Sequence, residues 1–486
     1  MKASNLISLS LISALILTSC GSDTQTPPDS GTDAPGTTTD ETTALTDGLE
    51  GYNFDGRTFT IVYSADQLGA SWPYDADEEN GDVLNDSVYA RNTAVEDRFN
   101  VEIEYYSTGG TNNEVPSAFL NSITAGDNAY QLAISHTFNM IPALITVGAL
   151  ADFNEIPNVD LDKPWWNASI RDNLEILGIL PIAVSDLIYS YADVIYVNRD
   201  MLEEFKLEDT YDLVYDGKWT WTKLAEMAKA VAGDLDGDGE YKMDDRFGFT
   251  LPGETASLMS RIIQSNGMMM ATVEDNGLLQ LLTVTERLQN TLERYYDLIY
   301  NDNKTYFGSI TDKATSVEIF SQGNVLFMHQ TTLQLPTLRD VDVNFGIVPL
   351  PKYDEDQEDY MSMLSSQILL VPNTTEEELT FIGTIAEALS YESWSRVTPA
   401  VYESIFESKY LRDATSYEMY QSICDSLVCD FNWNYGAGNK LFQLPMELIK
   451  GQKSTDAASY LAQYSESIMA EYETLFDAVR DVYGVE

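Results

Sequence analysis

The sequence predicts an α/β protein that folds as two domains behind a polar leader. About 440 residues follow the leader, which is long for one domain and suits two. The 44% of residues that are hydrophobic can fill large cores. A strand pattern, a helix pattern and a second strand pattern follow one another between residues 57 and 106, which is the order that builds α/β folds.

The first twenty residues have the pattern of a secretory signal. Lys2 supplies an early charge, an apolar run broken only by serines covers 6–17, and Leu-Thr-Ser leads to Cys20. The run is too short for a comfortable transmembrane helix. The residues before Cys20 resemble a bacterial lipobox, which implies a signal peptide over residues 1–19 and a lipid on Cys20. The alternative is an ordinary or uncleaved signal with an incidental cysteine.

Residues 20–50 are predicted to form a disordered, lipid-anchored tether. The stretch from 21 to 47 is almost wholly Gly, Ser, Thr, Pro, Asp and Ala, and such a segment cannot bury enough apolar area to offset its chain entropy. A flexible chain of that length spans on the order of 30 Å, enough to hold a folded body clear of lipid head groups. No later stretch is apolar enough to span a bilayer.

The charge balance disfavours one class of partner. Acidic residues outnumber basic residues by 78 to 27, and the formal net charge is −51. Nucleic acid is therefore disfavoured, because phosphate binding draws its affinity from Lys and Arg.

Cysteine is scarce. Beyond Cys20 the chain has only Cys424 and Cys429, so no disulfide framework holds the protein together. Five residues apart on an expected helix, these two side chains point in different directions. We interpret them as two small apolar thiols, with a disulfide as the alternative.

The first folded segment begins with the strand pattern at 57–63. A polar, aromatic loop follows, and its Trp72 and Tyr74 are candidate ligand contacts. Core positions then recur at helical spacing: Val88, Arg91, Val95 and Phe99. Residues 101–106 alternate as a strand, which completes a β-loop-α-β order.

A further short strand at 130–134 ends just before His136. In open α/β sheets ligands gather at the carboxyl ends of strands, so this turn is a candidate wall of a cleft. A lone histidine is more often a structural group than a functional one. The position of His136 at a strand end makes it a candidate ligand contact.

Two adjacent tryptophans, Trp165 and Trp166, follow Pro164. In an extended segment successive side chains alternate, so both cannot face one core. We therefore expect one of them to be exposed at a cleft or an interface, where an aromatic face can stack on a sugar ring. The alternative is a core anchor beneath a domain junction.

Residues 181–202 read as a turn, a buried strand and the start of a helix. The residues from Val194 to Val197 are β-branched or aromatic, and a helical pattern opens at Met201. Asp186 precedes the strand, and a carboxylate placed beside a buried strand needs a partner.

These residues carry a resemblance to a known family. The run Pro-Ile-Ala-Val-Ser-Asp (181–186), followed by Tyr-Val-Asn-Arg-Asp-Met-Leu (196–202), resembles the first lobe crossing of type 1 extracellular solute-binding proteins of ABC importers, the maltose-binding-protein-like group. Residues 85–101, with Asn-Asp-x-Val-Tyr-x-Arg-Asn and Val-Glu-Asp-Arg-Phe-Asn-Val, resemble a subgroup from anaerobic Gram-positive bacteria. The resemblance covers nearly everything after residue 50.

The resemblance implies an α/β, two-lobed periplasmic-binding-protein-like fold (type II), with discontinuous lobes joined by a hinge. The N-lobe would comprise residues 51–183 plus 352–396, and the C-lobe residues 184–351 plus 397–486. The segment at 345–352 resembles the second lobe crossing, and a capping box of Thr375 with Glu378 begins an N-lobe helix.

The resemblance also implies a cleft between the lobes. Asp186 would accept hydrogen bonds from solute hydroxyls, aromatic rings would stack on the solute, and His136 and His329 would contribute from opposite lobes. Trp219 lies in a Trp-Thr-Trp phrase where tryptophans mostly pack, and its role stays open. The candidate ligand contacts are Trp72, Tyr74, His136, Trp165, Trp166, Asp186, Trp219, His329, Gln330, Tyr360 and Trp433.

An acidic loop has the spacing of a calcium site. Counting Asp234 as position 1, carboxylates fall at positions 1, 3, 5 and 12, and a glycine falls at position 6. Position 12 is Asp where an EF-hand has Glu, which resembles a dockerin loop, and position 9 is Lys242. We expect a structural Ca²⁺ rather than a solvated acidic turn. The expected ligands are Asp234, Asp236, Asp238, Glu240 through its carbonyl, and Asp245.

The sequence lacks the Gly-x-Ser-x-Gly elbow, the phosphate-binding Gly-x4-Gly-Lys-Ser/Thr loop and the His-Glu-x-x-His motif. We therefore expect a binding protein rather than an enzyme, with no cofactor beyond the calcium. It would be a lipid-anchored monomer on the outer face of the cell membrane that delivers a saccharide to ABC permease subunits. A surface glycosidase and a peptide-binding protein of the same fold remain alternatives, because paired carboxylates are invisible in a chain with 78 acids.

Overall fold

The β-α-β order expected near the start of the folded region is present. Strand β1 (Arg57–Tyr63) leads through helix α1 (Val83–Phe99) to strand β2 (Val101–Ser107), and β1 and β2 pair in parallel. Helix α1 begins at Asp82, whose carboxylate accepts the backbone N–H groups of Leu84 and Asn85. The core positions that the sequence pattern predicted on this helix are all buried.

This computed structural model describes residues 45–64, 73–109, 113–136, 140–252, 256–274, 277–301, 305–307, 313–407 and 411–485. The signal peptide, Cys20, most of the expected tether, and Trp72 lie outside these ranges. Contacts divide the chain after Thr46, and Asp47–Glu486 forms one unit. Among the described residues, no helix combines the length and low charge that a bilayer span requires.

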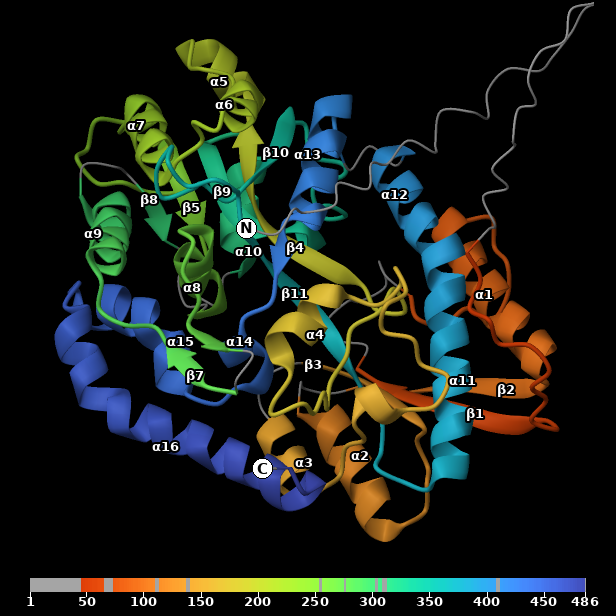
Figure 1. Ribbon diagram of the computed structural model, residues 1–486. Coiled ribbons are helices and arrows are strands. Elements are labelled where there is room, and N and C mark those ends of the chain that lie inside the picture. The colour runs from red at the N-terminus through yellow and green to blue at the C-terminus, as the bar shows by residue number, and fades with distance from the viewer. Residues whose placement is uncertain are drawn as a thin grey trace, which may run out of the picture. The chain divides into compact units, whose positions relative to one another are not determined.

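One mixed sheet organises the unit from Asp47 onward (Figure 1). Its strands run in the order β2-β1-β3-β11-β4-β9-β5-β8, with β10 paired to β4 and β12 paired to β11. The remaining strand bounds are β3 Leu132–His136, β4 Ser190–Asn198, β5 Phe247–Leu251, β8 Thr305–Phe307, β9 Val325–Thr331, β10 Phe345–Pro349, β11 Ser362–Leu370 and β12 Leu427–Val428. A separate hairpin pairs β6 (Ala271–Val273) with β7 (Leu279–Leu281).

Helices cover the sheet and complete the chain. Their bounds are α2 Glu114–Ala125, α3 Ile141–Thr146, α4 Ala168–Leu174, α5 Arg199–Phe205, α6 Thr210–Tyr215, α7 Trp221–Val231, α8 Ala256–Ser265, α9 Glu286–Tyr300, α10 Lys313–Ser321, α11 Glu376–Glu392, α12 Thr398–Glu407, α13 Ala414–Asp425, α14 Phe431–Tyr435, α15 Asn439–Pro445 and α16 Ala457–Tyr483. A π-helical turn, η5 (Ser393–Val397), joins α11 to α12.

Several expected elements are confirmed. The predicted buried strand lies within β4, where residues from Val194 to Val197 have no exposed surface. Helix α5 follows directly, because the Asn198 side chain caps it. Half of the expected capping box is present: Thr375 accepts the backbone N–H of Glu378 at the start of α11, whereas the Glu378 carboxylate pairs with Arg57.

Strand β11 lies between β3 and β4 in the sheet and pairs with both. Its residues 367–370 pair with β3, and its residues 364–366 pair with β4, both antiparallel. Helix α12 packs against α1, and α16 packs against α3 and α15. The C-terminal helices thus contact elements of both predicted lobes, and the lobe boundaries stay a prediction.

Cys424 and Cys429 are free, as predicted. Burial raises the pKa of the Cys424 thiol to about 11 and that of Cys429 to about 12. Both are therefore thiols rather than thiolates at neutral pH.

Candidate solute-binding site

The two faces of strand β4 carry different chemistry. Successive side chains on a strand point to opposite faces. Tyr191 and Asp193 share one face, and Ser190 shares the other with Ala192. Polar and aromatic side chains from β3, β9, β11, α8 and α14 lie on the same face as Asp193.

At the centre of that face is a buried ion pair. Arg261 Nε on α8 lies 2.9 Å from Asp193 Oδ2, and the two side chains are only 3% and 1% exposed. Burial acts to raise the pKa of Asp193, but the charge of Arg261 and the contact with His329 hold it below its usual value. The pair therefore remains ionised, and Nη1 of Arg261 lies 3.0 Å from the sulfur of Met363 on β11.

Trp433 on α14 links this ion pair to the end of strand β3. The Arg261 guanidinium lies over the indole, 4.4 Å from the ring centre, which is a cation–π contact. The His136 ring at the end of β3 meets Trp433 edge-on, with 6.2 Å between ring centres. The predicted ligand contacts His136 and Trp433 are thus brought together.

Two further polar side chains on this face have unused hydrogen-bonding groups. His329 on β9 is 1% exposed, and its Nε2 lies 3.5 Å from Asp193 Oδ1. Among the described residues, neither ring nitrogen of His329 has a hydrogen-bond partner. Gln367 on β11 accepts the Tyr74 hydroxyl through Oε1, whereas its buried Nε2 has no partner in the described part of the chain.

We call these residues the junction cluster: Tyr74, His136, Asp193, Arg261, His329, Gln367 and Trp433. Sequence reasoning missed Asp193, Arg261 and Gln367. Asp193 is the acid at the edge of the apolar β4 run, and Arg261 interrupts an apolar helix pattern. A charge inside an apolar run was the signal that could have found both of them.

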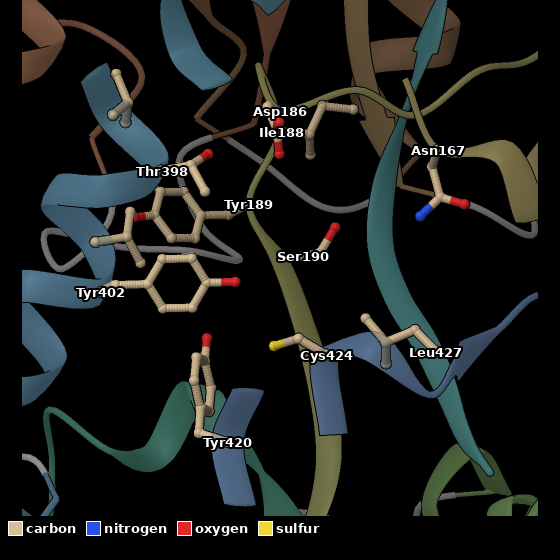
Figure 2. A pocket seen from close by; sticks show the side chains of 12 residues that line it. Asn167, Asp186, Ile188, Tyr189, Ser190, Thr398, Tyr402, Tyr420, Cys424 and Leu427 are labelled. Carbon is tan, nitrogen blue, oxygen red and sulfur yellow. The ribbon is translucent and has the colours of Figure 1, made fainter. Parts of the chain in front are cut away.

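Asp186 lies in a different place. It lies in a turn before β4 and lines a cavity of about 180 Å³ together with Ser190 (Figure 2). The Thr398 hydroxyl donates to the Asp186 carboxyl, and burial raises the pKa of that carboxyl to about 7. Neither His136 nor Trp433 is among the residues that line this cavity, so the structure does not bring Asp186 into the junction cluster.

The expectation that one of the adjacent tryptophans is exposed is wrong. Trp165 is 1% exposed and Trp166 is 4% exposed. Their indole N–H groups donate to the two oxygens of Glu387 on α11, at 2.9 and 2.7 Å. The segment turns instead of running extended, so both rings can face one core. Burial raises the pKa of Glu387 to about 7 despite these donors.

The remaining expected contacts lie away from the junction cluster. Trp219 is fully buried and donates to the Pro349 carbonyl at 2.8 Å. Tyr360 is partly buried, and its hydroxyl donates to the Val214 carbonyl at 3.3 Å. Gln330 pairs with Val194 on the other face of the sheet, and its Oε1 accepts the backbone N–H of Thr331.

The acidic loop brings three of its five expected ligands together. Carboxylate oxygens of Asp234, Asp236 and Asp245 lie within 4.8 Å of one another. Asp245 is 2% exposed and accepts two backbone N–H groups, which holds it in the loop. Asp238 instead contacts the Lys242 ammonium, which also lies 3.3 Å from Glu240. A calcium ion there stays a prediction.

Comparison with known families identifies the class of protein. Residues 91–402, more than half of the chain, match the family model of bacterial extracellular solute-binding proteins. The chain belongs to this family. The family consists of solute-binding proteins, as the sequence resemblance implied. No curated protein sequence matches the chain.

Solved structures agree on the fold. A sugar transporter protein from Rhizobium etli in an open conformation matches at 15% identity and a TM-score of 0.58, over 87% of this chain and 99% of that one. A cyclic α-maltosyl-1,6-maltose-binding protein from Arthrobacter globiformis matches at 13% identity and a TM-score of 0.55, over 88% and 100%. An ABC transporter solute-binding protein from Thermotoga lettingae, bound with α-D-tagatose, matches at 14% identity and a TM-score of 0.54, over 87% and 100%. These likenesses confirm the predicted two-lobed, periplasmic-binding-protein-like fold.

Proposed function

We propose that this protein captures a saccharide at the junction cluster and delivers it to the permease of an ABC importer. The supporting observation is the Trp433 ring, held between Arg261 and His136 beside polar groups of His329 and Gln367 that lack partners. Sugars present apolar ring faces and many hydroxyls, so an aromatic ring and unused hydrogen-bonding groups suit them. The family and the sugar-binding structural neighbours support the same class of solute.

Capture would use closure of two lobes about the segments that join them. β3, β4, β9, β11, α8 and α14 each contribute one residue to the cluster, and Tyr74 comes from the segment before α1. A solute held by His136 from β3 and by Arg261 from α8 would favour the closed arrangement, since it contacts both groups of elements.

Binding without turnover fits this cluster better than glycoside hydrolysis. Hydrolysis uses two carboxyl groups flanking the bond that breaks. The junction cluster contains one carboxyl group, Asp193, and Arg261 already pairs with it. Calorimetric titration with maltose, maltotriose and tagatose, followed by chromatography of the sugars, tests the choice: 1:1 binding with unchanged sugar supports capture, and shortened products support hydrolysis.

The location follows from the leader. We place the folded unit outside the cell, held by a lipid on Cys20 at the end of the expected signal peptide. Mass spectrometry of the membrane-extracted protein tests this: a diacylglyceryl group on Cys20 supports it, and an unmodified Cys20 contradicts it.

The acidic loop supplies a second proposal, a structural Ca²⁺ bound by Asp234, Asp236 and Asp245. The convergence of their oxygens within 4.8 Å favours it. Calcium prefers carboxylate and carbonyl oxygens, and these three side chains offer them on one short loop.

A further inference from the structure

The short helix that carries Trp433 depends on its neighbours for its position. Helix α14 has five residues, far fewer than a helix needs to persist by itself in water. Trp433 is 8% exposed, and the other residues of α14 are at most 3% exposed. The contacts that α14 makes with β6, α15, α4 and α8 therefore set the place of the Trp433 ring (Figure 1).

A fully buried carboxylate, Asp430, stands immediately before this helix. Its Oδ1 accepts the backbone N–H of Asn432 at 2.9 Å, which caps α14. Its Oδ2 accepts the backbone N–H of Met270 at 2.8 Å and the Nε2 group of Gln264 at 2.9 Å. One carboxylate thus joins the first turn of α14 to helix α8 and to the residue that precedes β6.

These hydrogen bonds exceed what a helix cap requires, since one oxygen is enough to cap α14. Burial raises the pKa of the Asp430 carboxyl, and the N–H groups of Met270, Gln264, Asn432 and Trp433 oppose that rise. A buried carboxylate is costly unless hydrogen bonds satisfy it. Because its donors come from three separate elements, α8, α14 and the segment before β6, they fix the carboxylate in one orientation.

Helix α8 holds the Trp433 segment at two points. The Arg261 guanidinium lies over the indole, 4.4 Å from the ring centre, and Gln264 donates to Asp430. Residues three apart on a helix lie on the same face, so both side chains can reach α14 from one side. Arg261 holds the ring itself, and Gln264 holds the backbone from which the ring projects. Two attachments fix the tilt of a ring, which a single one leaves adjustable.

We propose that Asp430 is a positioning residue of the saccharide site, which holds α14 through Gln264 and Met270 so that the Trp433 ring stacks on the solute. Asp430 would not itself touch the sugar. The inference deepens the proposed function and rests on it for the role of the ring. Its physical reason is that stacking requires a ring whose orientation is set before the solute arrives.

Fluorine NMR of the full chain labelled with 5-fluorotryptophan tests the positioning without any sugar. Trp433→Phe assigns the Trp433 signal. In Asp430→Ala we expect that signal to shift or broaden, because the ring is no longer held, and the signals of the other tryptophans to stay. The matched control is Asp82→Ala, which removes the cap of α1 and should leave the Trp433 signal in place.

Gln264→Met keeps the length of the side chain and removes only the donor to Asp430, so it tests the same link if Asp430→Ala does not fold. The Trp433 signal should shift in the same direction as in Asp430→Ala and by less. An unmoved Trp433 signal in the folded protein of either variant would overturn the proposal.

Calorimetric titration with maltotriose, paired with thermal unfolding, separates positioning from stability. Asp430→Ala and Gln264→Met should each weaken the affinity by about tenfold or more, whereas Asp82→Ala should lower the unfolding midpoint and keep the native affinity. Lowered midpoints with native affinity in the two site variants would show a merely structural role and overturn the proposal. A native protein that binds no saccharide would count against the proposed function, and the fluorine signal would still decide whether Asp430 positions the ring.

Discussion

Arg261 and Asp193 form an ion pair that is almost completely buried, with 2.9 Å between Nε and Oδ2. The same guanidinium lies over Trp433, so one side chain ties β4, α8 and α14 together. The pair therefore positions the aromatic ring to which we assign solute stacking.

Breaking this pair should destabilise the fold. Asp193→Asn leaves the Arg261 charge buried without its counter-ion, and we expect the free energy of unfolding to fall by about 3 to 5 kcal/mol. Denaturant titration at pH 7 measures this. The matched control is Asp477→Asn, which breaks the exposed pair with Arg480 and should cost less than about 1 kcal/mol. A cost for Asp193→Asn no larger than the control contradicts the account.

The same ion pair makes the free energy of unfolding depend on pH. Asp193 has a pKa below its usual value in the fold, so its contribution is present above the pKa of the unfolded chain. It is lost as pH falls through the lower folded value. In Asp193→Asn the slope of stability against pH below about pH 4 should be shallower than in the native protein. An identical slope would show that Asp193 is not held ionised.

Glu387 should be required to hold both tryptophans. Glu387→Ala leaves the indole N–H groups of Trp165 and Trp166 without their acceptors, and the expected cost is about 2 to 4 kcal/mol. Glu387→Gln keeps one carbonyl oxygen and should cost about half as much. Thermal unfolding compares both with Glu377→Ala, an exposed position on the same helix. Equal midpoints for all three variants would refute this role.

Ionisation of the Asp186 carboxyl should lower the free energy of unfolding as pH rises toward neutrality. Its pKa in the fold, about 7, exceeds the ordinary value of 3.8 for an aspartate, so the unfolded chain loses this proton first and the free energy of unfolding falls between those two pH values. Asp186→Asn should be more stable than the native protein at pH 8, by about 1 to 3 kcal/mol, and similar to it at pH 4. Urea titrations at both pH values measure the difference, with the exposed Asp172→Asn as control. A destabilised Asp186→Asn at pH 8 contradicts this account.

Calcium should stabilise the acidic loop. At a concentration of Ca²⁺ one hundred times its dissociation constant, stability should rise by about 2.7 kcal/mol. Asp234→Asn should remove this rise, whereas Asp297→Asn on α9, outside the loop, should keep it. Thermal scans with Ca²⁺ and with a chelator measure the effect, and equal midpoints in the two conditions would exclude a site that matters for stability.

Local patterns predicted much of the fold. Periodicity located β1, α1, β2 and β4, and the capping box at Thr375 located the start of α11, because these signals arise from nearby residues. The pairing of β11 with both β3 and β4 could not be predicted. It joins segments more than a hundred residues apart, and no local pattern records such a contact.

The site was predicted only in part. His136 was chosen because it ends a strand and Trp433 because its loop is aromatic, and the two rings do meet. Asp186 was chosen for its position before β4, but it lies in a turn outside that strand and lines a cavity that contains none of the residues of the junction cluster. The burial of Trp165 and Trp166 depends on Glu387, some two hundred residues later, and their sequence alone contains no trace of that partner.

The most direct test of the central claim is a thermal-unfolding scan of the native protein and of Trp433→Ala against mono- and oligosaccharides and short peptides. Tyr106→Ala, an exposed aromatic position, is the control. We predict that one class of saccharide raises the midpoint of the native protein and of the control, by about 2.7 kcal/mol of added stability at a hundredfold excess, and leaves Trp433→Ala unshifted. A midpoint raised only by peptides, or a saccharide shift that survives in Trp433→Ala, would contradict saccharide capture at the junction cluster.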